Sequence, residues 1–204
     1  MKEVSKQRML FATRNAHKTR EVREILGAGW EVEDLTARPD LPEVEETGDT
    51  FEENAKLKAL AASAHYAGWV LADDSGLEVD ALGGAPGVRS ARFAGEGAGM
   101  AANRALLRDK LSKGQSSDRR GRFRCVLALA RQGVVIRTFS GAVEGSIAPS
   151  ERGEGGFGYD ALFVPEGSGQ TFAELAPAEK HACSHRGRAL AALFAYLTAE
   201  EPAA

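Results

Sequence analysis

The sequence predicts an α/β fold built around a mixed β-sheet. Short apolar runs alternate with segments of helical periodicity in the first part of the chain, which is typical of strands joined by helices. Further on, two apolar runs flank Gln132-Gly133, and that spacing indicates an antiparallel hairpin. The 204 residues contain no internal repeat and no long linker, so we expect a single domain over residues 1–204.

The elements expected in the first part of the chain are a strand at 9–12, a helix at 16–26, a strand at 30–35, a helix from Thr50 to about Tyr66 and a strand at 69–72. Apolar residues at helical spacing, such as Val22 and Leu26, indicate the first helix. The second helix begins at Thr50, because Thr50 and Glu53 have the spacing of a capping box. An acidic loop at 39–48 precedes it.

The elements expected in the second part are a glycine-rich loop at 83–99, a helix at 100–111, strands at 123–130 and 134–143, a glycine-rich loop at 153–158, a strand at 161–164 and a helix at 185–198. The two longer strands form the hairpin. Residues 1–7 and 199–204 lie outside all these elements, and we expect flexible tails there.

The composition fits a soluble protein and argues against several function classes. Hydrophobic residues make up 43% and charged residues 27%, which is ordinary for a globular chain. The net charge of −3 argues against a nucleic-acid platform, which needs a basic surface. Cys125 and Cys183 are far apart in the sequence, so a disulfide framework is not expected. No apolar run suits a signal peptide or a membrane span, and we expect a cytoplasmic location.

The first candidate site follows the first strand, where residues 13–18 lead into a helix. A helix N-terminus presents free N–H groups and a partial positive charge, so it suits an anion such as phosphate. Lys18 lies in the first turn, where the helix dipole disfavours a cation unless an anion is bound. The alternative is that Asn15 caps the helix and Lys18 faces solvent. The pattern of a P-loop is missing.

Acidic side chains form the next candidates. Glu45 and Glu46 precede the capped helix, where a solvated loop is the common fate of such residues. Asp73 and Asp74 close an apolar strand, and consecutive strand residues point to opposite faces, so only one of them can aim at a given ligand. Carboxylate oxygens there suit Mg²⁺. The alternative is a turn in which Asp73 and Asp74 simply end the strand.

A later glycine-rich segment, residues 155–160, carries an aromatic side chain suited to a flat ligand. Glycines on both sides of Phe157 leave its ring room to stack on a base. The alternative is a tight turn in which Phe157 and Tyr159 pack inward.

A basic cluster near the last helix forms the final candidate. Lys180, His185 and Arg186 offer hydrogen-bond donors for carbonyl or phosphate oxygens, or else form a solvated helix start. His181 and His185 have i, i+4 spacing, but a zinc site is disfavoured because no third ligand lies nearby in the sequence.

Together, the residues of these motifs and their order along the chain are specific enough to indicate a family. The motifs are Thr-x-Asn-x-x-Lys (13–18), Glu-Glu-Thr-Gly (45–48), Phe-x-Glu-Asn-Ala (51–55), Ala-Asp-Asp-Ser-Gly-Leu (72–77), Gly-Gly-Ala-Pro-Gly-Val-x-Ser-Ala-Arg-Phe (83–93), Gly-Gly-Phe-Gly-Tyr-Asp (155–160) and Ser-His-Arg-Gly (184–187). The set resembles the inosine triphosphate pyrophosphatase family, also called XTP/dITP diphosphatases. The resemblance covers residues 9 to 197, nearly the whole chain.

The resemblance implies a homodimer of two-lobed subunits around a long mixed, twisted sheet flanked by helices, with the active-site cleft between the lobes. It implies Mg²⁺-dependent hydrolysis of ITP, dITP and XTP to the nucleoside monophosphate and pyrophosphate. From the net charge and the absence of a membrane-length apolar run, we expect no nucleic-acid or membrane partner.

The resemblance also implies roles for residues at matching positions. The triphosphate would be held by Thr13, Arg14, Asn15, Ala16, His17 and Lys18. The metal would be held by Glu45 and Asp74, Asp74 would also be the catalytic base, and Ser75 would contact substrate. The purine site would be formed by Phe157, Gly158, Tyr159, Asp160, Lys180, His185 and Arg186. Arg14 replaces a glycine often found in the family's first motif.

Two other functions stay open on the sequence. One is a nucleotide pyrophosphatase with another base specificity, and the other is a non-catalytic nucleotide-binding or RNA-binding module. The acidic net charge argues against the module, as do Glu45, Asp73 and Asp74, because clustered carboxylates repel phosphate unless a metal is bound.

Overall fold

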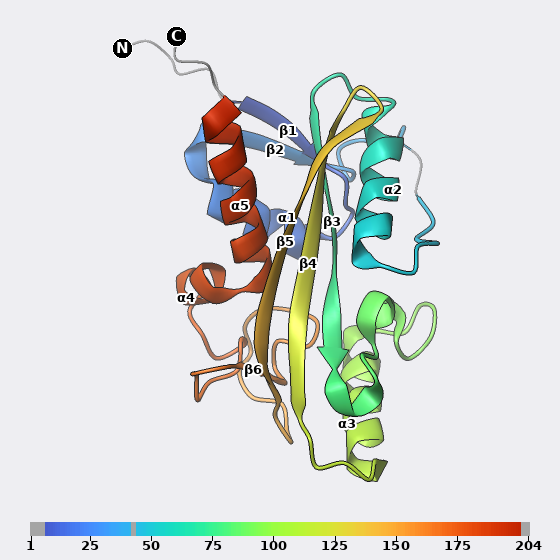
Figure 1. Cartoon of the computed structure of the whole chain (residues 1–204), viewed down its shortest axis with the longest axis vertical. Helices are drawn as coiled ribbons and strands as arrows, with labels where there is room; N and C mark the ends of the chain where they lie inside the picture. The colour runs from blue at the N-terminus through green and yellow to red at the C-terminus, as the bar shows by residue number, and fades with distance from the viewer. Residues whose placement is uncertain (1–6, 42–43, 201–204) are drawn as a thin grey trace. The chain divides into compact units, whose positions relative to one another are not determined.

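A six-stranded mixed sheet with the order β2-β1-β3-β4-β5-β6 organises the computed structural model, which describes residues 7–41 and 44–200 (Figure 1). Its strands are β1 (Gln7–Phe11), β2 (Trp30–Asp34), β3 (Trp69–Val79), β4 (Arg120–Arg131), β5 (Val134–Ile147) and β6 (Phe163–Pro165). The helices are α1 (Ala16–Leu26), α2 (Phe51–Ser63), α3 (Met100–Lys113), α4 (Pro177–Cys183) and α5 (His185–Glu200), with 3₁₀ turns at Gly27–Gly29, Asp80–Leu82 and Gly87–Arg92. The predicted α/β class is confirmed.

Most predicted elements lie where the sequence placed them, and most of the differences concern their lengths. The strand expected to end at Ala72 continues as β3 to Val79, so Asp73 and Asp74 lie inside a strand and the turn weighed as an alternative is not found. Helix α4 was not predicted. Gln7 begins β1 and α5 continues to Glu200. The rest of the two expected tails, residues 1–6 and 201–204, lies outside the described residues.

The chain divides into two units. Unit 1 comprises the residues up to Asp74, the segment Val126–Ser140 and the residues from Gly187 onward. Unit 2 comprises Ser75–Cys125 and Gly141–Arg186. Strands β3, β4 and β5 each contribute residues to both units.

In unit 1, β1 pairs in parallel with β2 on one side and with β3 on the other. Parallel neighbours need crossover connections, which α1 and α2 supply. Such crossovers are almost always right-handed. Because the first crossover moves to one side of β1 and the second moves back to the other, α1 and α2 are expected on opposite faces of the sheet.

Side-chain alternation on β3 agrees with this arrangement. Val70 and Ala72 share a buried cluster with Ala55 and Ala59 of α2, which runs alongside β3 (Figure 1). The small alanine side chains allow the helix backbone to approach the sheet closely. Since every second strand residue points to the same face, Asp74 belongs to the α2 face.

Unit 2 has its own apolar core. Its buried members are Leu77, Val79, Leu107, Leu111, Phe123, Val143, Ile147, Tyr159, Leu162, Phe163 and Phe172. The rings of Phe123 and Phe163 meet edge to face with their centroids 4.8 Å apart. Strand β6 pairs antiparallel with the end of β5. This core supports the loops that follow β5 and precede α4.

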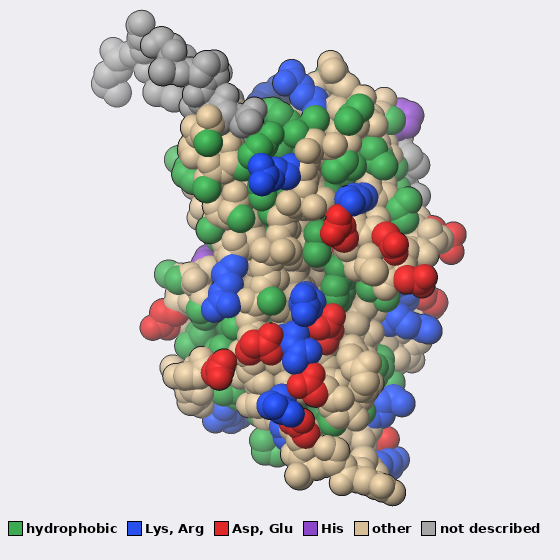
Figure 2. Space-filling model, viewed as in Figure 1, with side chains coloured by type: hydrophobic (Ala, Val, Ile, Leu, Met, Phe, Trp, Pro, Cys, Tyr) green, Lys and Arg blue, Asp and Glu red, His purple; other side chains and the backbone are tan. Residues whose placement is uncertain are grey.

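Acidic and basic side chains interleave over the lower part of the face seen in Figure 2. In unit 2, Arg122 contacts Asp80 at 2.8 Å and Glu144 at 2.9 Å, and Arg124 contacts Glu78 at 2.8 Å. Opposite charges paired in this way leave no strong field of one sign. This ion-pair network therefore offers no basic platform for nucleic acid.

Both cysteines of the sequence, Cys125 and Cys183, are free thiols. Among the described residues, no helix combines the length and apolarity needed to cross a membrane.

Candidate functional site

Asp73 and Asp74 of β3 point to opposite faces of the sheet and have different partners. Asp73 accepts a hydrogen bond from Lys18 of α1, and Asp74 accepts bonds from Asn54 and Lys58 of α2. Both carboxylates are buried. The prediction that only one of the two aspartates can aim at a given ligand is therefore consistent with the structure.

Asp74 sits in a polar cluster on the α2 face. Its Oδ1 lies 3.2 Å from Lys58 Nζ, and its Oδ2 lies 3.2 Å from Asn54 Nδ2. Lys58 Nζ also lies 2.6 Å from Glu46 Oε1. Burial raises the pKa of Asp74, the positive charge of Lys58 offsets part of that effect, and Glu46 raises it again, so the net direction is upward.

The carboxylates of Asp74 and Glu46 thus both contact the ammonium of Lys58. Two carboxylates placed in this way also fit a divalent metal. Oxygen ligands from one or two carboxylates, completed by substrate phosphates, are typical of Mg²⁺. Among the described residues, no group of three or more His, Cys, Asp or Glu is arranged to hold a metal ion. Glu45, the predicted metal ligand, is exposed, whereas its neighbour Glu46 is the glutamate that approaches Asp74.

Asn54 connects the acidic loop to Asp74. The backbone N–H of Gly48 donates to Asn54 Oδ1 at 2.8 Å, and Asn54 Nδ2 lies 3.2 Å from Gly48 O. The same Nδ2 donates to Asp74. The predicted capping box is present, with Thr50 Oγ1 accepting from the Glu53 N–H and Glu53 accepting from the Thr50 N–H. The segment 47–54 is therefore folded by its own hydrogen bonds so that Asn54 contacts Asp74.

The loop at 13–18 combines a capped helix with a buried lysine. Asn15 caps α1, and its Oδ1 accepts from the N–H groups of His17 at 3.0 Å and Lys18 at 3.3 Å. The cap proposed as the alternative is thus present. The solvent-facing lysine of that alternative is not, because only 15% of the Lys18 side chain is exposed and its ammonium bonds Asp73. His17 and Ala16 are exposed.

Arg14 has a structural contact that the sequence did not predict. Its guanidinium donates to the backbone carbonyls of Leu35 at 2.9 Å and Leu41 at 3.2 Å. These bonds tie the loop after β2 to the loop after β1. The predicted contact of Arg14 with substrate stays a prediction beside this observed role.

Unit 2 holds the second group of predicted residues. Asp160 Oδ2 accepts from the Phe157 N–H and from Lys180 Nζ, each at 2.7 Å. Asp160 and Lys180 are both buried, and Lys180 Nζ lies 5.1 Å from the centroid of the Phe157 ring. Phe157 is half-buried, whereas Tyr159 is buried and donates through its hydroxyl to Ser90 O at 2.9 Å. The inward packing weighed as an alternative is therefore found for Tyr159.

Arg186 and His185 begin α5 and are buried rather than solvated. Arg186 Nη2 lies 3.0 Å from Ser75 Oγ, and its guanidinium carbon lies 5.7 Å from the Phe157 ring centroid. The His185 ring stacks on Phe123, with centroids 4.7 Å apart. Ser75, Phe157, Lys180 and Arg186 are thus linked by contacts within unit 2, and the solvated helix start is wrong.

Gly156 gives a direct test of the geometry around Asp160. A Cβ at Gly156 would lie 2.1 Å from Asp160 Oδ2, whereas a Cβ at Gly158 meets open space, and both residues have a positive φ. Each Gly→Ala change carries the cost of the left-handed conformation, about 1–2 kcal/mol. Only Gly156→Ala also displaces the buried carboxylate, so we expect it to lower the free energy of unfolding by about 2 kcal/mol more than Gly158→Ala. Urea denaturation of both variants measures the difference, and equal losses would contradict this geometry.

Asn54 and Lys58 are site residues that the sequence reasoning did not single out, whereas Glu46 and Asp73 were considered as acidic candidates without an assigned role. Asn54 and Lys58 are four residues apart on α2, so they share a helix face, and that spacing was the available signal. Asn54 and Lys58 reach Asp74 because α2 packs against β3, and sequence periodicity alone does not reveal that packing.

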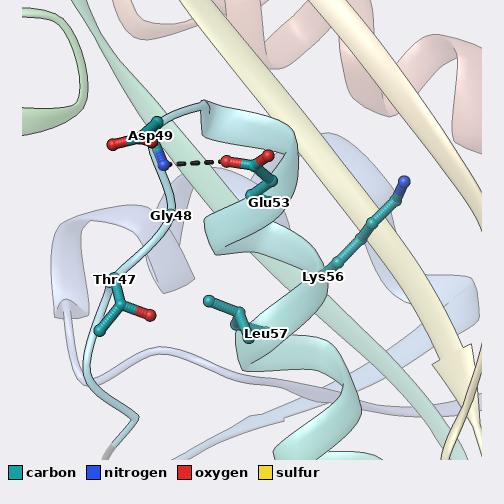
Figure 3. Close-up of a pocket in the computed structure, with 6 residues that line it drawn as sticks. All are labelled: Thr47, Gly48, Asp49, Glu53, Lys56 and Leu57. Atoms are coloured by element: carbon teal, nitrogen blue, oxygen red, sulfur yellow. Dashed lines mark hydrogen bonds between the residues drawn. The ribbon is translucent and has the colours of Figure 1, made fainter.

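A shallow hollow of about 410 Å³ lies beside the start of α2 (Figure 3). Its lining is Thr47, Gly48, Asp49, Glu53, Lys56 and Leu57. In Figure 3 the Asp49 N–H points to Glu53, which accepts its hydrogen bond at 2.9 Å. None of the six residues was predicted to contact substrate, so this hollow is not the predicted nucleotide site.

Comparisons with known proteins place this arrangement in a family. The chain is 52% identical over 192 residues to the dITP/XTP pyrophosphatase of Exiguobacterium sibiricum, covering 94% of this chain and 97% of that protein. It is 50% identical over 192 residues to the dITP/XTP pyrophosphatase of Geobacter sulfurreducens, covering 93% and 96% of the two chains. A solved structure of a HAM1 protein from Coxiella burnetii matches with a TM-score of 0.85 at 40% identity, covering 95% of this chain and 99% of the other.

The sequence profile of the Ham1 family matches residues 9–196, which include every residue predicted for the site. The predicted resemblance is confirmed by this match and by the two relatives above. The chain belongs to the Ham1 family.

Proposed function

We propose that this chain hydrolyses non-standard purine nucleoside triphosphates, namely ITP, dITP and XTP, to the nucleoside monophosphate and pyrophosphate. The observation that carries the proposal is 52% identity over 94% of the chain to a protein named dITP/XTP pyrophosphatase. The activity would remove deaminated purines from the nucleotide pool. It would be exercised in the cytoplasm, where that pool is found.

Asp74 supplies the base in the proposed reaction. A water oxygen bonds to the α-phosphorus, the bridging P–O bond to the β-phosphate breaks, and pyrophosphate leaves. Asp74 accepts the proton from that water. Its raised pKa suits a general base, because proton acceptors work best when their pKa approaches the working pH.

We propose Mg²⁺ as the cofactor, held by Asp74 and the acidic loop. Glu45 stays the ligand predicted from the family, and Glu46 is the second candidate because it shares Lys58 with Asp74. When bound, Mg²⁺ would offset phosphate charge and favour the deprotonated form of a nearby water. Lys58 and Lys18 add positive charge for the phosphates from the α2 and α1 faces respectively.

The residues of unit 2 supply base recognition in this proposal. Phe157 offers its ring for stacking, while Arg186, His185 and Lys180 offer hydrogen-bond donors. Hypoxanthine and xanthine carry a 6-oxo acceptor, whereas adenine carries a 6-amino donor. Buried donors that pair with the oxo group would be left unpaired by adenine, which disfavours ATP strongly.

A substrate panel tests the proposal. Pyrophosphate release from ITP, dITP, XTP, GTP, ATP and a pyrimidine triphosphate is measured with Mg²⁺ and with EDTA. We expect ITP, dITP and XTP to be favoured over ATP by about 10²-fold or more, with turnover lost in EDTA. Release of orthophosphate, a preference for the pyrimidine, or binding without turnover would each contradict the proposal.

We further propose that the functional species is a homodimer, as the family resemblance implies. Light scattering should then give a mass near twice the chain mass of 21.7 kDa. A mass of one chain at the assay concentration would contradict it.

A further inference from the structure

We propose that Asp73 is a positioning residue that holds the ammonium of Lys18 where the phosphate chain binds. This inference rests on the function proposed above. The Nζ of Lys18 donates to Asp73 Oδ1, the Asp73 side chain is 0% exposed, and the Lys18 side chain keeps 15% of its surface exposed. The carboxylate is thus sealed inside unit 1, and its lysine partner reaches the surface.

The placement of Asp73 on β3 separates its task from that of Asp74. Asp74 faces α2, where Asn54 and Lys58 bond it. Asp73 faces the opposite side, where it meets a lysine from the first turn of α1. Two consecutive carboxylates therefore bring two lysines to the middle of the same strand, one from each face.

A free lysine would be a poor phosphate ligand in this position. Its flexible side chain loses rotamer entropy on binding, and the dipole of α1 disfavours a cation in the first turn. Asp73 removes both difficulties before substrate arrives, since it fixes the side chain and supplies a compensating charge. Pre-ordering of this kind improves binding because less freedom is lost in the complex.

The pair is not explained well by stability alone. Burying a carboxylate and an ammonium costs desolvation, and an apolar pair of similar size is often equally stable or more stable. An ammonium has three donors, and one bond to Asp73 does not use them all. A partly exposed ammonium anchored by a buried carboxylate is therefore suited to receive an anion.

A double-mutant cycle on activity tests the inference. Asp73→Asn should raise the KM for ITP and the inhibition constant of pyrophosphate about tenfold, with kcat changed by less than about threefold. In a Lys18→Gln background the same change should alter KM by less than about twofold, because the lysine through which Asp73 acts is gone. Lys56→Gln, which removes an exposed lysine of α2, is the matched control and should leave KM unchanged. An Asp73→Asn effect of equal size in both backgrounds would overturn the inference.

A second cycle, on stability, needs no activity. Lys18→Gln removes the ammonium from a buried carboxylate and should lower the urea midpoint of unfolding, and adding Asp73→Asn should recover most of that loss. If Asp73→Asn alone yields no folded protein, the comparison of Lys18→Gln with the double variant decides. A double variant less stable than Lys18→Gln overturns the inference.

The two cycles also separate this inference from the proposed function. A wild-type protein that releases no pyrophosphate from ITP overturns the function, and with it the role of Asp73 in binding phosphate. An active wild type whose Asp73→Asn effect is independent of Lys18 overturns the positioning role alone.

Discussion

Asp74→Asn should lower kcat/KM for ITP by about 10³-fold or more while the protein stays folded. The change removes the proposed proton acceptor, and general-base catalysis is commonly worth about 10²–10⁴-fold. It also removes one of the carboxylate charges proposed to hold Mg²⁺. Because both losses act on the same reaction step, we expect no rescue by raised Mg²⁺ concentration.

The fold should survive this substitution because asparagine keeps the shape and an acceptor oxygen. Lys58 donates to Oδ1 and Asn54 to Oδ2 of Asp74, so asparagine keeps one of these two bonds through its single oxygen. Loss of activity would therefore report on chemistry and not on unfolding. Circular dichroism and the urea midpoint check this point, and Asp109→Asn, at an exposed position on α3, is the matched control.

The pH dependence of stability gives an independent check on Asp74. Burial raises its pKa, and the charges of Lys58 and Lys18 offset only part of the increase. A folded state that binds the proton more tightly than the unfolded chain loses stability as pH rises from the unfolded pKa, near 3.9, through the folded pKa. Asp74→Asn removes that loss, so its unfolding free energy relative to wild type should increase as pH rises above about 4 in EDTA. A difference independent of pH would contradict the raised pKa.

The sequence predicted the local elements well because their signals are local. The helix at Ala16–Leu26 was predicted to the residue, and the capping box at Thr50 was found where its spacing placed it. Strand β3 was predicted too short, because Asp73 and Asp74 interrupt its apolar run. The strand tolerates them because each carboxylate meets a lysine from a helix distant in sequence, and such a partner cannot be read from local periodicity.

The candidate site shows the same division between local and tertiary information. The family motifs directed attention to Asp74 and to the loop of Lys18, and the structure supplies a separate partner for each aspartate of β3. Lys58 lies between two motifs and was not singled out, since its role depends on α2 packing against β3. Tyr159 lies within a motif, yet its hydroxyl bonds Ser90 in the unit 2 core. The motif therefore did not show that Tyr159 packs into the core while the neighbouring motif residues do not all do so.

Arg186→Ala should lower the preference for ITP over ATP by about 10- to 100-fold. A hydrogen bond to a charged group contributes about 1.5–3 kcal/mol, which corresponds to this range. Arg186 is 1% exposed and lies beside Phe157, so its guanidinium would meet the edge of a base stacked on that ring. ITP loses this donor in the variant, whereas ATP, with a 6-amino group, never used it. The ratio of the two kcat/KM values measures the effect.

A ratio is the appropriate measurement because Arg186 also bonds Ser75, and its removal disturbs unit 2 in other ways. General damage lowers turnover of both nucleotides, since they share the triphosphate, and cancels in the ratio. GTP sharpens the test, because it carries the same 6-oxo group as ITP: the GTP-to-ITP ratio should stay constant while both fall against ATP. Arg188→Ala, at an exposed position on the same helix, should change neither ratio. An unchanged ITP-to-ATP ratio in Arg186→Ala would assign the reading of the 6-oxo group to His185 or Lys180 instead.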